Sequence, residues 1–325
     1  IFTILIAAIA RDTSPRASSS KICPTIGSVR CAARAKRRSS PSAERVPLPS
    51  SRPAGTDFCR PFLKWAGGKY RLLPRILEAL PAGPRLVEPF VGSGAVWLNA
   101  PHPHILAADV NPDLVALYRV VEGEGEAFLA RCRPLFTPET NTPEAFYALR
   151  ARFNAASEPG ERAALLLYLN RHAYNGLVRY NAAGAYNVPF GRYRAPYFPE
   201  RELRSFALRA RKAEFAASDF RETFRRLRPG DVVYADPPYA PLSATADFTA
   251  YAGCSFTWAD QVDLARLARE AARAGIPVLI SNHDTDAVRE LYAGARLARF
   301  AVSRSISCRG ADRRPVGELL ALFEE

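Results

Sequence analysis

Four short apolar runs alternate with helical stretches over most of the chain. They are "RLVE" at 85–88, "HILAAD" at 104–109, "DVVYAD" at 231–236 and "IPVLIS" at 276–281. Apolar runs of this length are typical of buried β-strands. Strands that are separated by helices belong to parallel sheets, so the pattern predicts an α/β fold with a doubly wound sheet.

One helix between the last two runs is well marked. Thr257 and Asp260 form a start that resembles a capping box, and Gly275 ends the helix. One apolar face consists of Leu264, Leu267, Ala268 and Ala271. This helix connects two of the predicted strands, as a parallel sheet requires.

Residues 113–215 break the rhythm of strands and helices. Thr142 and Pro143 begin a helix that carries an apolar face, and "ERAALLLYLNR" predicts a second helix. The stretch "HAYNGLVRYNAAGAYNVPFGRYRAPYF" then follows, full of Asn, Gly, Tyr and Arg. We interpret 113–215 as a helical insertion that ends in an irregular, aromatic and basic surface. The sheet domain would then comprise residues 59–112 and 216–325.

The positive charge is concentrated in the first part of the chain. The formal net charge is +13, and residues 1–56 contribute +8 of it, from ten Lys/Arg against Asp12 and Glu44. We expect residues 1–58 to be a disordered basic tail or an overextended translation start. The opening "IFTILIAAIA" is too short to span a bilayer and lacks a preceding basic region.

The rest of the chain is moderately basic, at about +5. A basic surface favours a polyanionic partner such as nucleic acid, although a solvated charged face is the alternative. The six cysteines are scattered, with no C-x-x-C pair and no His/Cys cluster. This spacing argues against a zinc site and a disulfide framework, and fits a reducing compartment.

"RLVEPFVGSGAVWLN" predicts a strand, a glycine turn and the start of a helix. Gly92 and Gly94 would let the backbone approach a ligand closely. The pyrophosphate fingerprint needs glycine at position 97, where this chain has Trp97, so we expect a nucleoside-type cofactor without a pyrophosphate. Asp109, at the next strand end, can accept hydrogen bonds from ribose hydroxyls. The alternative is a tight turn between strand and helix with no ligand.

The motif Asp236-Pro237-Pro238-Tyr239 lies at the C-terminal end of a predicted strand, where open α/β sheets bind ligands. A carboxylate beside a carbonyl that precedes proline offers two acceptors in a rigid geometry, which matches an exocyclic amine with two N–H groups. Holding both hydrogens turns the nitrogen lone pair towards an electrophile, and Tyr239 can stack on the ring. A proline-rich turn is the alternative, but it explains neither the acid nor the tyrosine.

Upstream, "PFLKWAGGKYRLLP" places Trp65 and Lys69 on a loop before a helix. The spacing of a phosphate-binding P-loop is absent. Lys64 and Lys69 could therefore be solvated surface charges. His283, in "SNHDT" at a strand end, is interpreted as structural.

Together these motifs resemble the family of Dam-type DNA adenine N6-methyltransferases, from about Phe62 to Phe323. The stretches that carry the resemblance are "FLKWAGGKY", "VEPFVGSG", "LYLNRHAYNGLVRYN", "YNVPFGRYRAPYFPE", "DPPYAPLSATADFTAY", "PVLISNHDT" and "RSIS". The resemblance does not extend to residues 1–58, and it weakens at "CRGADRR" (308–314).

The resemblance implies a doubly wound methyltransferase sheet, S-adenosyl-L-methionine as cofactor, and adenine in double-stranded GATC as target. The residues that it assigns to the cofactor are Trp65, Lys69, Phe90, Gly92, Gly94, Asp109 and Asp236. Those that would hold a flipped adenine, as the catalytic group, are Asp236, Pro237 and Tyr239.

The insertion would then be a DNA target-recognition domain. Lys64 and Arg179 would contact guanines, and Tyr174 with Asn175 would wedge into the base stack. Leu177 and Pro189 would meet thymine methyl groups. We expect three further arginines to contact phosphates and so to position the protein without reading sequence: Arg171, Arg192 and Arg194.

The chemistry fits this assignment, because adenine N6 cannot be reached inside a duplex and the base must be extruded. Catalysis would come from in-line positioning and from polarisation by Asp236, without a covalent enzyme intermediate. We expect a cytoplasmic bacterial enzyme, monomeric and associated with the nucleoid, that needs no metal or membrane. Strand marking for mismatch repair, replication timing and protection from a nuclease stay open as cellular roles.

Three alternatives differ from this prediction. An NAD-dependent oxidoreductase is disfavoured by Trp97 and gives the Asp-Pro-Pro-Tyr unit no role. A catalytically inactive DNA-binding module does not need the intact acceptor pair. An adenine methyltransferase of a restriction–modification system, with a different target sequence, fits the same motifs.

Overall fold

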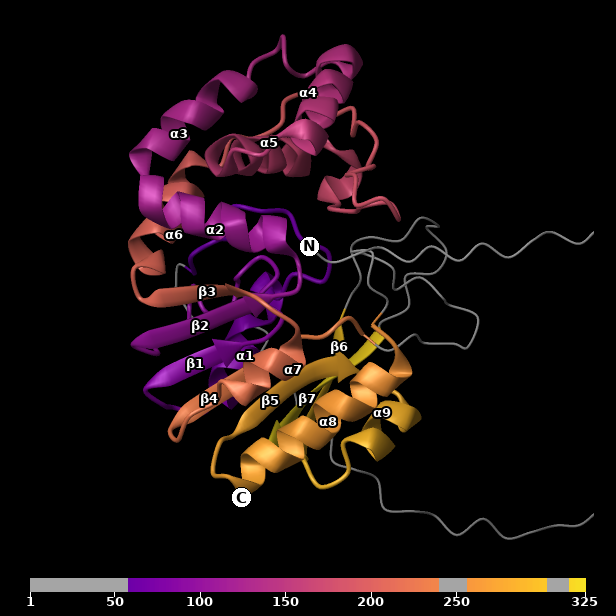
Figure 1. Ribbon diagram of the computed structural model, residues 1–325. Coiled ribbons are helices and arrows are strands. Elements are labelled where there is room, and N and C mark those ends of the chain that lie inside the picture. Colours follow the sequence, from indigo (N-terminus) through magenta and orange to yellow (C-terminus); the bar gives the residue numbers. More distant parts are fainter. Residues whose placement is uncertain (1–57, 240–255, 303–315) are drawn as a thin grey trace, which may run out of the picture. The chain divides into compact units, whose positions relative to one another are not determined.

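The four apolar runs form neighbouring strands of one seven-stranded sheet, in the order β3-β2-β1-β4-β5-β7-β6 (Figure 1). The computed structural model describes residues 58–239, 256–302 and 316–325. These residues belong to one compact unit. The strands are β1 (Arg85–Glu88), β2 (His104–Asp109), β3 (Ala213–Ala217), β4 (Asp231–Ala235), β5 (Val278–His283), β6 (Arg296–Val302) and β7 (Val316–Phe323).

Helices connect the strands and also form the region between β2 and β3. The α-helices are α1 (Leu73–Ala79), α2 (Pro112–Glu124), α3 (Glu126–Cys132), α4 (Pro143–Ala155), α5 (Pro159–His172), α6 (Glu200–Ala210), α7 (Phe220–Arg225), α8 (Trp258–Arg273) and α9 (Asp286–Leu291). The 3-10 helices are η1 (Tyr70–Leu72), η2 (Arg133–Leu135) and η3 (Tyr174–Gly176). Among the described residues, no helix combines the length and apolar character that crossing a bilayer requires.

The sheet has an apolar core on each face, which confirms the predicted doubly wound fold. Successive side chains of a strand point to opposite faces. On β2, Ile105 and Ala107 belong to the core that includes α1, α2 and α6, whereas Leu106 and Ala108 belong to the core of α7 and α8. Strands β2, β1, β4 and β5 are parallel, as predicted, and β3 is parallel to β2. Their C-terminal ends therefore share one edge of the sheet.

The sequence did not predict β3, β6 or β7. Strand β7 pairs antiparallel with both β5 and β6 and closes that side of the sheet. Strand β3 pairs with β2, so the predicted boundary between residues 215 and 216 falls inside a strand of the sheet. The division into a sheet domain and a recognition domain stays a prediction.

The predicted caps of α4 and α8 are confirmed. Thr142 accepts a hydrogen bond from the backbone of Ala145 at the start of α4. Thr257 and Asp260 form a complete capping box at the start of α8. Helix α5 is buried on all sides, from Ala163 to His172, so it is the centre of the helical region and not a surface helix.

The predicted helix after the glycine turn is wrong. Residues 89–99 form successive tight turns, with hydrogen bonds from Gly94 N to Val91 O (2.8 Å) and from Leu98 N to Gly94 O (3.2 Å). Three predictions lie outside the described residues: the basic tail, the motif residues 240–251, and the segment 304–314.

Candidate active site and DNA interface

Asp236 directly follows β4, at the edge of the sheet where the parallel strands end. Its Oδ1 atom lies 2.8 Å from the ammonium of Lys69, and the Asp236 side chain is 21% exposed. The ammonium also lies 4.6 Å from the centre of the Tyr239 ring and donates to the Gly67 carbonyl at 2.6 Å. The structure thus brings Lys69, Asp236 and Tyr239 together. It also shows that this carboxylate can hold a nitrogen donor beside the aromatic ring.

A serine on the neighbouring strand fixes the orientation of the Asp236 carboxylate. Ser281, on β5, donates from Oγ to Asp236 Oδ1 at 2.7 Å. The hydroxyl of Tyr234 lies 3.2 Å from the same Oγ atom. Burial, followed by the charge of Asp236, raises the pKa of Tyr234 well above its usual value, so this hydroxyl stays protonated. No sequence pattern distinguished Ser281 as a site residue, although it lies in the quoted stretch "PVLISNHDT".

Pro238 and Tyr239 are held from α8 and β5. Gln261 on α8 donates from Nε2 to the Pro238 carbonyl at 2.8 Å, and its Oε1 accepts from Asn282 at 3.0 Å. The Tyr239 ring meets the edge of His283, with ring centres 4.7 Å apart. These contacts place His283 in support of Tyr239. Gln261 is a second supporting residue that sequence reasoning missed.

Glu88, the last residue of β1, is buried beside this site. Desolvation raises the pKa of Glu88 well above its usual value. The backbone N–H of Trp97 opposes this shift, and the charge of Asp236 adds to it. Glu88 Oε1 has no hydrogen-bond partner within the described part of the chain. Burial therefore favours the neutral form of Glu88, which would add no second negative charge next to Asp236.

The glycine turn and the end of β2 form a cradle. Asp109 accepts hydrogen bonds from the backbone N–H of Gly92 and of Asn111, both at 3.0 Å. Gly92 has a φ of +46°, and a Cβ atom there would lie 2.9 Å from the indole nitrogen of Trp65. Burial raises the pKa of Asp109, and these backbone bonds oppose the shift. An aromatic side chain, an exposed backbone and a carboxylate with free acceptor positions fit a nucleoside-type cofactor.

The other predicted cofactor residues line the same turn. Phe90 stacks on Phe220 with ring centres 5.4 Å apart. A Cβ atom on Gly94 would lie 2.5 Å from the indole nitrogen of Trp97. Trp97 is fully buried and meets Phe206 at 5.1 Å. The tryptophan that replaces the third glycine of the pyrophosphate fingerprint therefore fills the core beneath the turn.

Several predicted DNA contacts gather around η3. Tyr174 is 49% exposed, and Asn175 has the left-handed φ of 53°. The side chain of Asn170 accepts from the Lys64 backbone N–H at 2.9 Å and donates to the Lys64 carbonyl at 2.7 Å. A Cβ atom on Gly176 would lie 2.5 Å from the Lys64 Cβ. The loop that carries Lys64 thus packs directly against the segment of Tyr174 and Asn175.

Residues 177–190 form a hairpin-like segment, which we call the recognition hairpin. Tyr180 and Tyr186 form an antiparallel bridge, and Asn187 N donates to the Arg179 carbonyl at 3.1 Å. Arg179 is exposed, and its Nε atom donates to Asn187 Oδ1 at 2.8 Å. Leu177 is half-buried and Pro189 is exposed. The hairpin therefore presents Arg179 and Pro189 on the surface.

The prediction that Arg171 contacts phosphate is wrong. Arg171 is only 9% exposed and donates to the carbonyls of Tyr197 (3.0 Å) and Phe62 (3.3 Å). It lies near the end of the buried helix α5, where it bonds to backbone. Arg192 and Arg194 are exposed, and their phosphate contacts stay predictions.

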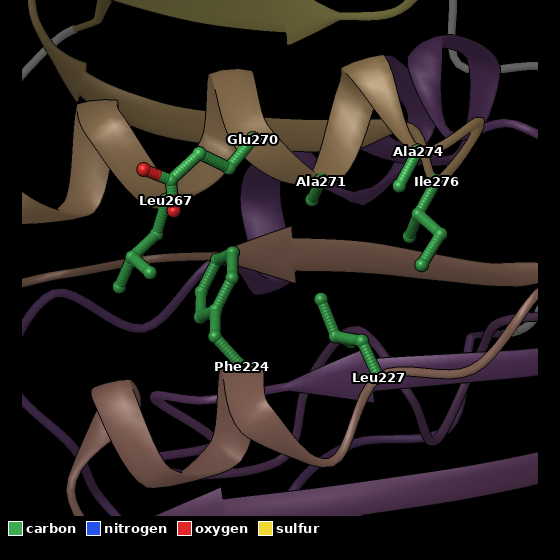
Figure 2. Close-up of a pocket in the computed structure, with 7 residues that line it drawn as sticks. All are labelled: Phe224, Leu227, Leu267, Glu270, Ala271, Ala274 and Ile276. Carbon is green, nitrogen blue, oxygen red and sulfur yellow. The ribbon is translucent and has the colours of Figure 1, made fainter.

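Two pockets elsewhere on the described part of the chain lack the predicted catalytic and binding residues. Figure 2 shows the smaller pocket, of about 180 Å³, between α7 and α8. Phe224, Leu267 and Ala271 line it, and Glu270 lies at its edge. The second, of about 350 Å³, lies among α2, α3 and α6. Neither is lined by a predicted site residue, and in the described ranges no three His, Cys, Asp or Glu side chains form a potential metal site.

Comparison with known proteins gives close relatives. The family model described as D12 class N6 adenine-specific DNA methyltransferase matches residues 65–306. The DNA adenine methylase of Escherichia coli (strain K12) is 52% identical over 265 residues, which cover 82% of this chain and 95% of that protein. The DNA adenine methylase of Vibrio cholerae serotype O1 (strain El Tor Inaba N16961) is 49% identical over 265 residues, which cover 81% and 96%.

Solved structures match less closely. The rRNA methyltransferase aviRa from Streptomyces viridochromogenes matches with a TM-score of 0.34 and 15% identity, over 82% of this chain and 90% of that one. A likeness of this size adds nothing to the family match.

Proposed function

Because the chain belongs to the D12 class of N6 adenine-specific DNA methyltransferases, we propose that it methylates adenine N6 in double-stranded GATC. The enzyme class predicted from the sequence, a site-specific adenine DNA-methyltransferase, is confirmed by this membership. The proposal adds the target sequence and the residues that act. The observation that carries it is the Asp236 carboxylate, which holds a nitrogen donor beside Tyr239 at the end of β4.

S-adenosyl-L-methionine is the cofactor that a methyltransferase of this family uses, as the sequence predicted. When bound, it supplies an electrophilic methyl group. We assign its nucleoside part to Trp65, Phe90, Gly92 and Asp109, because these residues share the turn at the end of β1 and β2. Each carboxylate oxygen of Asp109 already accepts one backbone hydrogen bond, and each keeps a lone pair for a hydroxyl donor.

Asp236 and the Pro237 carbonyl would hold the two hydrogens of the adenine amine. Ser281 keeps the carboxylate in one orientation, so little reorganisation is needed when the amine arrives. The lone pair of N6 is then directed out of the ring plane towards the methyl group. The Tyr239 ring would stack on the adenine, and its position is fixed by His283.

Lys69 pairs with Asp236 in the structure. Its ammonium and the Ser281 hydroxyl both lie on Asp236 Oδ1, at 2.8 and 2.7 Å, so the adenine amine would bind to Oδ2. Lys69 would also contact the cofactor, as the resemblance implies. Burial favours the neutral form of Glu88, which would limit the negative charge beside Asp236 to one carboxylate.

The proposed DNA contacts come mainly from side chains that are exposed on the helical region. An extruded adenine leaves a gap in the base stack, which the half-exposed Tyr174 could fill. Arg179 would pair with guanine O6 and N7, at about 1–3 kcal/mol of discrimination. Lys64 would contact the other guanine, and Leu177 with Pro189 the thymine methyl groups. Arg192 would contact phosphate.

The test is methyl transfer from labelled S-adenosyl-L-methionine to short duplexes that contain one GATC site. We expect label in this duplex and none in a duplex whose two target adenines already carry N6-methyl groups. Plasmid treated with the protein should also resist a nuclease that cuts only unmethylated GATC. Equal transfer to duplexes without GATC would reject this target and favour the restriction–modification alternative.

The same proposal extends to the setting of the enzyme. We propose that it acts as a monomer on chromosomal DNA in the bacterial cytoplasm, at the nucleoid. The relatives named above are bacterial, and a single chain carries both the catalytic groups and the DNA-reading groups. The absence of a metal requirement stays a prediction, which undiminished transfer in the presence of a chelator would support.

A further inference from the structure

Tyr180 ties the recognition hairpin to the start of α2, shortly after the end of β2. The hydroxyl of Tyr180 donates to Asp113 Oδ2 at 2.7 Å, across 67 positions of sequence. Tyr180 directly follows Arg179 and belongs to the antiparallel bridge with Tyr186. Neighbouring side chains of an extended strand point to opposite sides. Tyr180 is therefore the inward-facing neighbour of the exposed arginine.

Asp113 is itself held firmly. Arg162 on α5 donates to both carboxylate oxygens, at 2.6 and 2.9 Å, in a bidentate ion pair. Its Nη1 atom also donates to the carbonyl of Phe153 at 2.8 Å, and its guanidinium lies 4.2 Å from the centre of that ring. The Asp113 side chain is 14% exposed. A charge-assisted pair of this geometry leaves the carboxylate with little freedom, so Tyr180 bonds to a fixed point.

The same aspartate is joined to the cofactor side. Asp113 is the second residue of α2, and its backbone N–H donates to the side chain of Asn111 at 3.0 Å. The backbone N–H of Asn111 in turn donates to Asp109 Oδ1 at 3.0 Å. Asn111 is buried, at 6% exposure. Three hydrogen bonds therefore link the Asp109 carboxylate, through Asn111 and Asp113, to Tyr180. Tyr180 is the residue next to Arg179.

We propose that Asp113 and Tyr180 are positioning residues that set Arg179 relative to the cofactor end of β2. The inference rests on the proposed function and adds to it a source of guanine discrimination that touches neither DNA nor cofactor. Because coupling between two sites is reciprocal, the tie also links occupancy near Asp109 to the strength of DNA reading.

The test compares Tyr180→Phe with a matched control, Tyr186→Phe. Both changes remove one hydroxyl from the same hairpin, and the Tyr186 hydroxyl donates to the Leu177 carbonyl at 2.8 Å, with no contact to Asp113. We measure kcat and KM for a GATC duplex and for a duplex with the guanine that Arg179 reads replaced. For Tyr180→Phe the ratio of the two kcat/KM values should fall about tenfold, with kcat on saturating GATC unchanged. Tyr186→Phe should keep the ratio within about twofold.

Two further measurements separate positioning from a general loss of stability. In the Arg179→Ala background, Tyr180→Phe should leave the remaining discrimination unchanged, because it acts through that arginine. We expect S-adenosyl-L-homocysteine to raise the DNA affinity of the wild-type protein, and this increase should be smaller in Tyr180→Phe and unchanged in Tyr186→Phe.

Equal losses in the two phenylalanine variants, or additive effects with Arg179→Ala, would overturn the positioning role. Failure of the proposed function would look different. Wild-type protein would then transfer methyl groups equally to both duplexes, and this result would reject the target and the positioning role together.

Discussion

The catalytic edge of the sheet and the recognition hairpin hold their functional groups in different ways. At the edge, Asp109 and Asp236 follow β2 and β4, and each is fixed by hydrogen bonds from neighbouring segments. In the recognition region, by which we mean residues 174–194, Tyr174 is 49% exposed, and Asn175 and Arg192 have the left-handed backbone conformation. The proposed catalytic groups therefore lie at strand ends, whereas the proposed DNA-reading groups lie on a surface segment that a few buried hydrogen bonds hold.

This difference predicts that the two regions fail differently when changed. Changes at the edge should reduce the rate and spare DNA binding. Changes in the recognition region should alter affinity and discrimination and spare the rate on saturating target DNA.

The largest effect is expected at the catalytic edge. Asp236→Ala should lower methyl transfer by about 10³-fold or more, because it removes the group that polarises the amine. The dissociation constant for a GATC duplex should stay within about threefold. Ser281→Ala removes only the hydrogen bond that orients the carboxylate, so a loss of about tenfold is expected. Single-turnover rates and filter binding measure both quantities, and normal turnover by Asp236→Ala would refute its role.

The next effect separates base reading from phosphate contact. Arg179→Ala should lose about 1–3 kcal/mol of discrimination at one guanine and leave the others unaffected. Arg192→Ala should weaken binding to every sequence and make the dependence of log K on log salt shallower by about 1. Filter binding across salt concentrations and single-base variants is the measurement. Identical behaviour of the two variants would contradict the assignment.

A third change tests whether Arg171 stabilises the fold and does not contact phosphate. Arg171→Leu should leave the salt dependence of DNA binding unchanged, because this guanidinium bonds to buried carbonyls and not to solvent. It should lower the free energy of unfolding by about 2–4 kcal/mol, since two carbonyls lose their donors. Urea denaturation gives the stability, and Arg192→Ala serves as the matched surface control. A shallower salt slope in Arg171→Leu would restore the phosphate contact.

The smallest effects concern pH, and the two regions should respond in opposite directions. Burial raises the pKa of Glu88 in the folded protein and so favours its neutral form. The contribution of Glu88 to the free energy of unfolding is present below the usual carboxyl pKa. It is lost as pH rises towards the pKa that Glu88 has in the folded protein. Glu88→Gln should remove this loss, so its unfolding free energy should fall less steeply than that of the wild type above about pH 4.5.

His172, beneath the recognition region, behaves in the reverse way. Burial lowers the pKa of His172 to about 4, and its Nδ1 atom lies 2.9 Å from the Tyr168 carbonyl. Its contribution is present above the usual histidine pKa of 6.5 and is lost as pH falls towards 4. His172→Phe should flatten the decline in unfolding free energy over this window. If the unfolding free energy of His172→Phe declined at low pH as steeply as that of the wild type, His172 would not change its protonation on unfolding.

Sequence patterns predicted those helices and strands that are specified by their own residues and not by their neighbours in the fold. β4 and β5 contain the apolar runs VVYA and VLI, and Thr257 with Asp260 marks the start of α8. β3 has the sequence AEFAA, whose alanines have little preference for strands, and it forms because β2 pairs with it. The helix predicted after Gly94 does not form, and the turns there pack over the buried Trp97.

The motif residues of the site were predictable, and their partners were not. Asp109 and Asp236 stand at strand ends, which a one-dimensional pattern can locate. Arg171 and Arg192 look alike in sequence, because both lie among aromatic and basic residues. Only the packing of α5 on all sides shows that Arg171 is buried. The raised pKa of Glu88 likewise comes from its burial, which the sequence alone does not show.

A crystal structure with a GATC duplex and S-adenosyl-L-homocysteine would test the account most directly. The adenine should lie outside the helix, with N6 about 2.7–3.2 Å from both an Asp236 carboxylate oxygen and the Pro237 carbonyl. An adenine that stays stacked in the duplex, or an N6 atom bound by other groups, would contradict it.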